Sequence, residues 1–315
     1  MDVYWTVGLI APLLAFYLLM VWSRSRVLSR LVGRDPAVRL GSWAGVHSIQ
    51  GRRQHMEDTF AYHPVFRTKG SHKFQLHAVF DGHGGSVCSR FLADQLPTLA
   101  RSCIDERLSN ARTDVQCNDA VRAALMDVFE KSEREYLALA ETNQLDDGST
   151  AVVAVLHSHH SGADVYVANL GDSRAVLAHK AFALPLSTDH KPDRPDERRR
   201  VESLGGRVVF WGTWRVQGIL SLSRAIGDRN LKPLVSSVPE IVSRRVSPGD
   251  DFIILASDGL WDVLSSQNAV DMVYKHGWRS SSAQAARELT RTAMQMGSMD
   301  NITCMIIDLH QLHNK

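Results

Sequence analysis

The sequence predicts a layered domain of the α+β class, preceded by one N-terminal transmembrane helix. Three observations support this prediction. Residues 3–22 contain no charged side chain. The remaining chain holds short runs with the pattern of strands, and longer stretches with the apolar spacing of helices lie between them. Because a helix must bury its apolar face, this order of elements favours sheets that are covered by helices.

Composition and charge exclude several classes of protein. The 315 residues are 44% hydrophobic and 22% charged, which excludes a fully disordered chain and a polytopic membrane protein. The net charge is +2, and the first 40 residues hold five arginines against two aspartates, so the remaining 275 residues sum to −1. We therefore expect no nucleic-acid partner, because such partners are bound by basic surfaces.

The uncharged run at residues 3–22 is long enough to cross a bilayer as a helix. Aromatic residues lie at both of its ends, and four arginines follow it directly, so the positive-inside rule places the body in the cytosol. A cleaved signal peptide is the weaker alternative, since the segment begins without Lys or Arg and has no small-residue cleavage site. A buried soluble helix is a third. The sequence thus predicts a single-pass anchor at 1–22 that contacts membrane lipid, and a basic juxtamembrane linker at 23–42.

Six apolar or alternating runs in the body predict strands. They are Phe74–Phe80, Ala151–Leu156, Asp164–Asn169, Arg174–Ala178, Asp251–Ala256 and Thr303–Ile307. Helical spacing predicts four helices. These cover Ser86–Ala100, Asn118–Glu141 with Asn118 as its N-cap, Ser266–His276 and Ala283–Met296. Residues 97–117 match no motif and are expected to form a loop.

The stretch Ser187–Trp214 differs from the rest of the body. It combines prolines, a pair of glycines and a dense run of arginines. This predicts a surface excursion from the sheet that is partly helical around Pro195–Leu204. A charge run of this kind is usually a solvated face.

The cysteines favour a reduced, cytosol-facing domain. They are widely spaced, include no C-x-x-C pair and lie in no nucleophile motif, which argues against a disulfide framework or a zinc ribbon. They are Cys88, Cys103, Cys117 and Cys304.

Acidic residues lie where the predicted strands end. Asp81 and Asp258 each follow an apolar strand and precede a glycine, Asp172 follows another strand, and Asp300 precedes the last one. The pair Glu57-Asp58 ends a short polar run. Any one of these acidic residues alone is weak evidence for a functional site, because Asp-Gly is a common turn. Together, carboxylates at one rim of a sheet would repel each other unless a cation joined them.

Oxygen ligands select Mg²⁺ or Mn²⁺ over zinc, and two such ions can activate water and polarise a phosphoryl oxygen. Glycine beside Asp81 lets a backbone carbonyl approach an ion. The residues alone therefore indicate a metal-dependent hydrolase.

Seven motifs, in this order, resemble the type 2C metal-dependent protein serine/threonine phosphatases. They are Arg53-x-x-Met56-Glu57-Asp58, Asp81-Gly82-His83-Gly84-Gly85, Gly148-Ser149-Thr150-Ala151, Gly171-Asp172-Ser173-Arg174, Ser223-Arg224-Ala225-Ile226-Gly227-Asp228, Ser257-Asp258-Gly259-Leu260-Trp261-Asp262 and Asp300-Asn301. The resemblance implies a phosphatase domain over 43–315 with a flap at about 187–214. It also implies a four-layer α-β-β-α sandwich, in which two antiparallel sheets are flanked by helices.

The resemblance implies a site with two Mg²⁺ or Mn²⁺ ions. Asp81 would bridge both ions, the Gly82 carbonyl would bind one, and Asp258 and Asp300 would hold the other. Glu57 and Asp58 would act at the same site, partly through bound water.

Three further roles follow from the resemblance. Arg53 would clamp the substrate phosphate, and His83 would protonate the leaving seryl or threonyl oxygen. Asp172 and Asp262, together with Asp258, would hold a weaker third ion. The implied reaction is hydrolysis of phosphoserine and phosphothreonine in proteins by a metal-activated water, with no phosphoenzyme.

The anchor and the segments 48–53 and 214–218 are also similar to a membrane-anchored animal member of that family. This similarity suggests the endoplasmic reticulum, although mitochondrial insertion of the same anchor stays open. We expect a monomer. The alternatives to an active phosphatase are a catalytically weak, phosphoprotein-binding adaptor on the same fold and a nuclease, and the charge of −1 over the body disfavours the nuclease.

Overall fold

The computed structural model describes residues 38–40, 43–68, 72–109, 111, 113–277 and 279–313. The predicted anchor at 1–22 and most of the linker at 23–42 lie outside these residues. Within them, no helix has both the length and the apolar composition that a membrane crossing requires.

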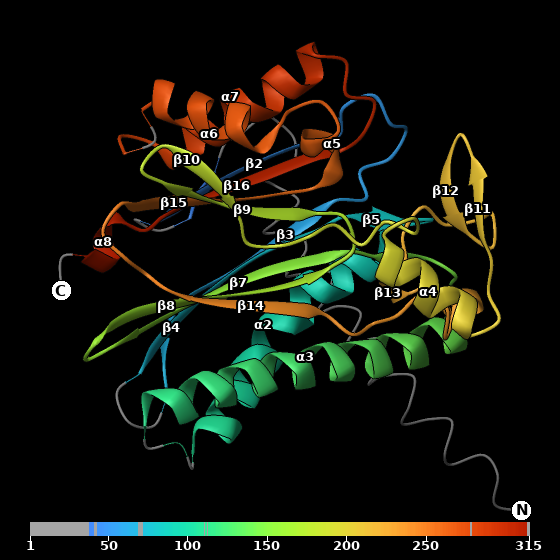
Figure 1. Cartoon of the computed structure of the whole chain (residues 1–315), viewed down its shortest axis with the longest axis horizontal. Coiled ribbons are helices and arrows are strands. Elements are labelled where there is room, and N and C mark those ends of the chain that lie inside the picture. Colours follow the sequence, from blue (N-terminus) through green and yellow to red (C-terminus); the bar gives the residue numbers. More distant parts are fainter. Residues whose placement is uncertain are drawn as a thin grey trace, which may run out of the picture. The chain divides into compact units, whose positions relative to one another are not determined.

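Two antiparallel sheets face each other, and helices cover the outer face of each (Figure 1). The six-stranded sheet has the order β1-β2-β16-β15-β9-β10. Its strands are β1 (Val38–Leu40), β2 (Ala44–Ile49), β16 (Ile302–Asp308), β15 (Asp250–Ala256), β9 (Arg174–His179) and β10 (Phe182–Pro185). The five-stranded sheet has the order β14-β8-β7-β4-β3. Its strands are β14 (Glu240–Arg245), β8 (Gly162–Leu170), β7 (Ala151–His159), β4 (Lys73–Phe80) and β3 (Thr59–Arg67).

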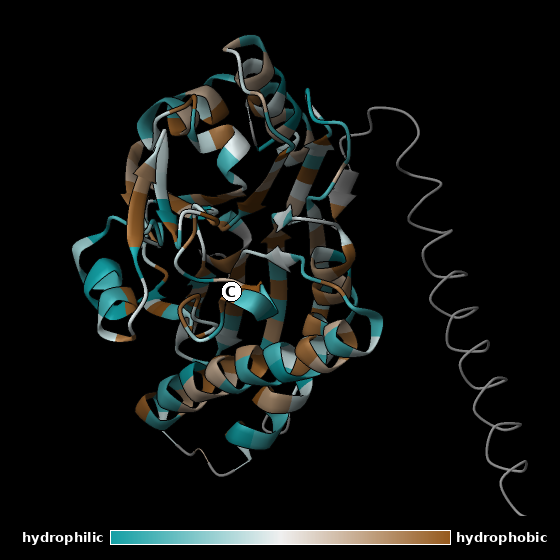
Figure 2. Cartoon of the chain, turned by 90° about the vertical axis from the view of Figure 1, so that its right-hand side faces the viewer, coloured by the Kyte–Doolittle hydropathy of each residue, from teal (hydrophilic) through white to brown (hydrophobic). Residues whose placement is uncertain are grey.

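The helices form the two outer layers. α2 (Val87–Leu108) and α3 (Asp114–Asn143) pack on the five-stranded sheet, while α5 (Asp258–Trp261), α6 (Ser266–Lys275) and α7 (Ser282–Gln295) pack on the six-stranded sheet. The turn α8 (His310–His313) follows β16. Hydropathy colouring shows apolar residues concentrated in the strands, with both polar and apolar residues on the helices (Figure 2).

Alternation along single strands explains these layers. On β7, Ala151, Val153 and Val155 face α2 and α3, whereas Val152, Ala154 and Leu156 face the other sheet. β15 alternates in the same way, with Ile253 and Leu255 between the sheets. Because successive side chains point to opposite faces, a continuously apolar strand can serve two cores at once.

All six predicted strands are present, as β4, β7, β8, β9, β15 and β16, and the predicted α+β class with antiparallel sheets and helices is confirmed. The expected loop at 97–117 is wrong, because α2 continues through Pro97 to Leu108. The predicted cap Asn118 is also wrong. α3 begins one turn earlier, where the Thr113 side chain accepts a hydrogen bond from the Gln116 N–H at 3.2 Å.

The N-terminus of α2 is capped from a distant segment. Asp147 Oδ2 accepts hydrogen bonds from the backbone N–H groups of Val87 and Cys88, each at 2.9 Å. Asp147 Oδ1 accepts the hydroxyl of Tyr136 on α3. The cap therefore ties α2, α3 and the segment before β7 together, and it satisfies two of the helix's free N–H groups.

The excursion at 187–214 contains the predicted helix, α4 (Pro195–Ser203), followed by a hairpin of β11 (Val208–Trp211) and β12 (Thr213–Val216) that was not predicted. Glu197 on α4 is buried, and its carboxylate accepts hydrogen bonds from Arg200 at 2.8 Å and from Arg224 at 2.6 Å. This buried ion cluster holds α4 on the body, so the arginine run is only partly a solvated face.

A small sheet with the order β13-β6-β5 closes one rim of the sandwich. It consists of β13 (Ile226–Gly227), β6 (Gly148–Ser149) and β5 (Gly82–His83). The single-turn helix η1 (Arg229–Leu231) follows β13. This rim gathers three of the glycine-containing motifs singled out in the sequence.

Candidate active site

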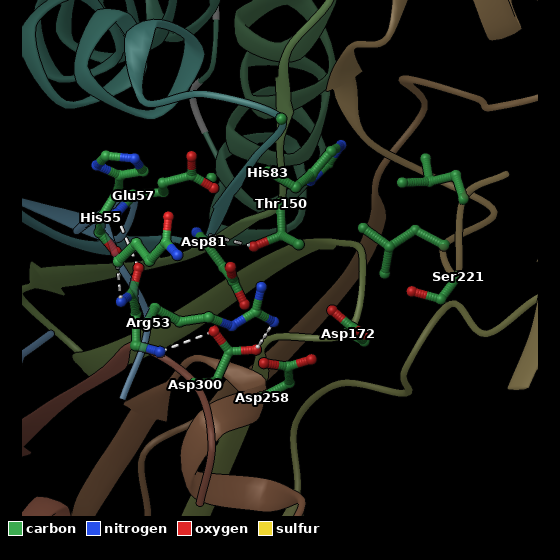
Figure 3. A pocket seen from close by; sticks show the side chains of 16 residues that line it. Arg53, His55, Glu57, Asp81, His83, Thr150, Asp172, Ser221, Asp258 and Asp300 are labelled. Carbon is green, nitrogen blue, oxygen red and sulfur yellow. Dashed lines mark hydrogen bonds and ion pairs between the residues drawn. The ribbon is translucent and has the colours of Figure 1, made fainter. Parts of the chain in front are cut away.

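A cavity of about 360 Å³ opens at this rim (Figure 3). Polar and charged side chains from segments far apart in the sequence line it. The lining residues are Arg53, Gln54, His55, Glu57, Asp81, Gly82, His83, Gly84, Thr150, Asp172, Leu220, Ser221, Leu222, Asp258, Asp300 and Asn301. Of the predicted site residues, only Asp58 and Asp262 do not line the cavity.

Three carboxylates converge in the cavity. One oxygen each of Asp81, Asp172 and Asp258 lies within 4.8 Å of the others. Asp81 follows β4, Asp172 lies in the turn between β8 and β9, and Asp258 opens α5. The Asp81 backbone is fixed because its N–H donates to Thr150 Oγ1 at 3.1 Å, and its carbonyl accepts the Thr150 N–H at 2.9 Å.

The electrostatics of this cluster favour a bound cation. Burial, followed by the charges of Asp58 and Asp258, raises the pKa of Asp81 well above its usual range. Burial, followed by the charges of Asp172 and Asp262, raises the pKa of Asp258 in the same direction. Burial raises the pKa of Asp58 to about 6. Carboxylates that repel each other in a partly dry site ionise together only when positive charge is supplied.

Unpaired oxygens show that divalent cations fit here. Oδ1 of Asp58 and Oδ1 of Asp258 are both buried without a hydrogen-bond partner. Buried polar atoms are normally satisfied, so these two oxygens are free for a cation or its bound water. The donors in the cluster are all oxygens, which suit Mg²⁺ or Mn²⁺.

Gly82 brings the first acidic pair close to the cluster. A Cβ atom on Gly82 would lie 2.6 Å from the carbonyl oxygen of Glu57 and 2.9 Å from Ser89 Oγ. Only glycine therefore allows the segment that carries Glu57 to pack against β5. This contact places the Glu57 side chain on the cavity wall.

Asn301 anchors the loop that carries Arg53 and Glu57. Its Nδ2 donates to the carbonyls of Gln50 at 2.7 Å and His55 at 2.9 Å, and its Oδ1 accepts the Glu57 N–H at 2.8 Å. One side chain thus fixes both ends of this loop. The loop in turn sets where its charged side chains lie relative to the carboxylates.

Arg53 lies at the mouth of the cavity, paired with a predicted metal ligand. Its Nη2 donates to Asp300 Oδ2 at 2.6 Å, and the Arg53 side chain is 58% exposed. Burial opposes its charge, but the contact with Asp300 prevails and raises the pKa of Arg53. With a cation on Asp300, the guanidinium would be free to turn toward a bound anion.

His83 is held by a carboxylate that has no assigned role in the sequence analysis. Its Nε2 lies 3.0 and 2.9 Å from the two oxygens of Asp228. Burial opposes protonation of the ring, but the hydrogen bond and charge of Asp228 outweigh it and raise the pKa of His83. The contact needs Gly148, because a Cβ there would lie 2.2 Å from Asp228 Oδ2 and 2.6 Å from His83 Nε2.

Asp172 and Asp262, the two residues assigned to a third ion, occupy different positions. Asp172 is buried in the central cluster, where Lys191 Nζ donates to its Oδ2. This ion pair outweighs burial and raises the pKa of Lys191. Asp262 is exposed at the C-terminal end of α5, one turn after Asp258.

Three residues with no assigned role therefore support the site: Lys191, Asp228 and Asn301. Two of them, Asp228 and Asn301, lie inside motifs that the sequence analysis quoted. Nothing in the sequence indicated the partner of Asp228.

Comparison with known proteins agrees with this geometry. A model of the family described as protein phosphatase 2C matches residues 43–302. The chain belongs to the protein phosphatase 2C family. This is a family of metal-dependent protein serine/threonine phosphatases, so the enzyme class predicted from the motifs is confirmed.

Two rice relatives of this protein phosphatase 2C are named as probable members of the family. "Probable protein phosphatase 2C 52" is 40% identical over 264 residues, which cover 84% of this chain and 50% of that protein. "Probable protein phosphatase 2C member 13, mitochondrial" is 38% identical over 284 residues, which cover 87% of this chain and 72% of that protein. The chain thus spans half the length of the first relative.

Two solved structures share the protein phosphatase 2C fold. A serine-threonine phosphatase 2C from Toxoplasma gondii is 26% identical with a TM-score of 0.73, and the match covers 87% of this chain and 96% of that one. A sex determining protein of C. elegans is 26% identical with a TM-score of 0.74, covering 85% and 64%.

Proposed function

We propose that this chain is an active phosphatase that hydrolyses phosphoserine and phosphothreonine in proteins and that it is tethered to a membrane with its catalytic domain in the cytosol. The observation that carries the activity is the convergence of Asp81, Asp172 and Asp258 beside the pair of His83 and Asp228. Asp81, the Gly82 carbonyl, Asp258 and Asp300 would hold two Mg²⁺ or Mn²⁺ ions, and Asp172 would hold a weaker third.

The bound ions would activate a water and polarise the phosphoryl group. The chain's own residues supply the remaining functions. His83 carries the proton that the leaving oxygen needs, and Asp228 keeps the ring charged and oriented. The Arg53 side chain is 58% exposed, so its guanidinium can form a bidentate hydrogen bond with a phosphate at the cavity mouth.

A phosphate-release assay on the full-length protein tests the activity. The substrate is a phosphothreonine peptide, offered with Mn²⁺, with Mg²⁺ and with EDTA. We expect release that needs the cation and is lost in Asp81→Asn, which removes one charge at nearly constant volume. Near-normal turnover in Asp81→Asn would refute the assignment, and no release from folded protein would favour the phosphoprotein-binding adaptor.

The membrane tether rests on the sequence of residues 3–22 and the arginines after it. Similarity to a membrane-anchored animal member of the family favours the endoplasmic reticulum. Translation with microsomes, followed by alkaline extraction, tests the tether. We expect the full chain to stay in the membrane fraction and a chain starting at residue 23 to be released. Release of both would refute the tether.

A further inference from the structure

A second group of metal-binding side chains lies far from the cavity. His157 and His159 are two residues apart on β7, so they share the face of the sheet that packs on α2 and α3. Asp164 lies directly opposite His157 on β8. Seven residues of extended strand, about 23 Å, separate His157 from Thr150 at the cavity wall. The two groups therefore share no residues.

The distances within this group suit a single small cation. One ring nitrogen each of His157 and His159 and one oxygen of Asp164 lie within 4.8 Å of one another. His72 approaches from the segment before β4, with its Nδ1 2.9 Å from His157 Nε2. His159 Nε2 lies 2.8 Å from Asp164 Oδ2. Ligand atoms of a tetrahedral zinc ion are about 3.3 Å apart, so only small shifts are needed.

His157 is already prepared to act as a ligand. Its side chain is buried and stacks on Phe74 with ring centres 4.3 Å apart. Burial lowers the pKa of His157 to about 3, and it lowers that of His72 as well. Both rings are therefore neutral at physiological pH, and neutral imidazole is the form that binds metal.

We propose that His72, His157, His159 and Asp164 form a second metal site, specific for a zinc-like transition ion. Three imidazole nitrogens and one carboxylate oxygen make a donor set that favours Zn²⁺ over Mg²⁺, the opposite of the all-oxygen set at the cavity. The ion would join the segment before β4 to β7 and β8 at the outer end of the five-stranded sheet.

Arg245 competes with the ion for this position. Its Nη1 donates to His159 Nε2 at 2.9 Å and lies 3.5 Å from Asp164 Oδ2. The guanidinium and a divalent cation cannot share these atoms. The Arg245 side chain is 44% exposed, so it can turn into solvent when the ion binds. Removing the Arg245 side chain should therefore strengthen metal binding. If the histidines served only to pack the fold, this substitution would have no such effect.

Zinc binding by the full-length protein tests the proposal. The protein is made without a histidine tag and kept in excess Mg²⁺, so that the cavity is filled, and Zn²⁺ is titrated against a competing chelator. We expect one tightly bound Zn²⁺ per chain. Co²⁺ in place of Zn²⁺ should give the intense visible absorption of a tetrahedral site, whereas Co²⁺ at an octahedral oxygen site absorbs weakly.

Matched variants locate the ion. His157→Phe keeps the ring stacked on Phe74, and Asp164→Asn keeps the volume, yet each should weaken zinc binding at least about tenfold. Arg245→Gln should tighten it about tenfold, because a repelling charge is removed. His276→Gln, an exposed histidine elsewhere, and Asp81→Asn should leave it unchanged. The proposal is overturned if the wild type binds no zinc in excess Mg²⁺, or if Asp81→Asn rather than His157→Phe abolishes binding.

Discussion

Replacing Gly148 by alanine should disable proton donation by His83 while leaving the cation site in place. Gly148 lies on β6, between β5 and β13, directly beneath the contact of His83 with Asp228. The added Cβ would lie 2.2 Å from Asp228 Oδ2 and 2.6 Å from His83 Nε2. It therefore enters the space in which these two side chains meet.

The size of the disturbance follows from the contacts. Ordinary contact begins near 3.4 Å, so Asp228 Oδ2 would have to move by about 1.2 Å. Asp228 cannot retreat freely, because it is buried, it holds a left-handed φ of 50°, and its N–H is bonded to the Asp147 carbonyl at 3.2 Å. The hydrogen bonds to His83 would break. General acid catalysis contributes about 10²–10⁴-fold, so we expect about a hundredfold loss of kcat.

The assay compares two leaving groups. A phosphothreonine peptide releases an alkoxide that must be protonated, whereas p-nitrophenyl phosphate releases a stable nitrophenolate that needs no acid. We expect kcat of Gly148→Ala to fall about a hundredfold on the peptide and only a few-fold on p-nitrophenyl phosphate. Asp228→Asn should give the same split. His276→Gln, the exposed position used above, is the control. Equal losses on both substrates, or no loss on either, would refute the reasoning.

Three further predictions concern the support of the site and the stability of the fold. Asn301→Ala removes three hydrogen bonds from the loop that carries Glu57, so the apparent affinity for Mg²⁺ in the phosphate-release assay should weaken at least about tenfold; an unchanged affinity would contradict this role. Burial disfavours the Glu197 carboxylate, but the two arginines that contact it prevail and lower its pKa from 4.5 to about 2. The Glu197 carboxylate therefore stabilises the fold fully above pH 4.5, and this stabilisation, about 3 kcal/mol in all, is lost as the pH falls toward 2. The free energy of unfolding of Glu197→Gln, measured with urea, should consequently depend less on pH between 5 and 3 than that of the wild type. Asp147→Ala removes the cap of α2 and leaves the Tyr136 hydroxyl unpaired, which should lower the free energy of unfolding by about 3 kcal/mol; a loss below about 1 kcal/mol would show that water replaces the carboxylate.

The sequence predicted the strands that are apolar on both faces, because a continuous apolar run is visible without knowledge of its partners. It missed β14, which reads Glu-Ile-Val-Ser-Arg-Arg and pairs on only one side. An edge strand that is half exposed has no apolar run to detect. It also placed the start of α3 too late, because residues 114–116 at the start of that helix are exposed and show no buried apolar face.

The acidic residues of the cavity were predictable for a local reason, since each lies at a strand end beside a turn residue. Their supporting residues were not, because support depends on contacts between distant segments. Asp228 meets His83 across 145 residues, and Asn301 meets His55 across 246. Lys191 lies in the arginine-rich excursion, where nothing local distinguishes it from solvated neighbours. Composition can indicate a cluster of carboxylates, but only the fold shows which basic side chain is paired with which carboxylate.

The double burial of β7 has a consequence for how the sheet aligns as it folds. A strand that is apolar on one face is held in register by that pattern, since a slip of one residue would expose its core side. β7 buries small and medium apolar side chains on both faces, so a slip changes little in apolar burial. Its alignment must come from its ends, above all from Gly148, Ser149 and Thr150, which bond to the Asp81 segment. The residues that build the catalytic rim are thus also the ones that align the sheet.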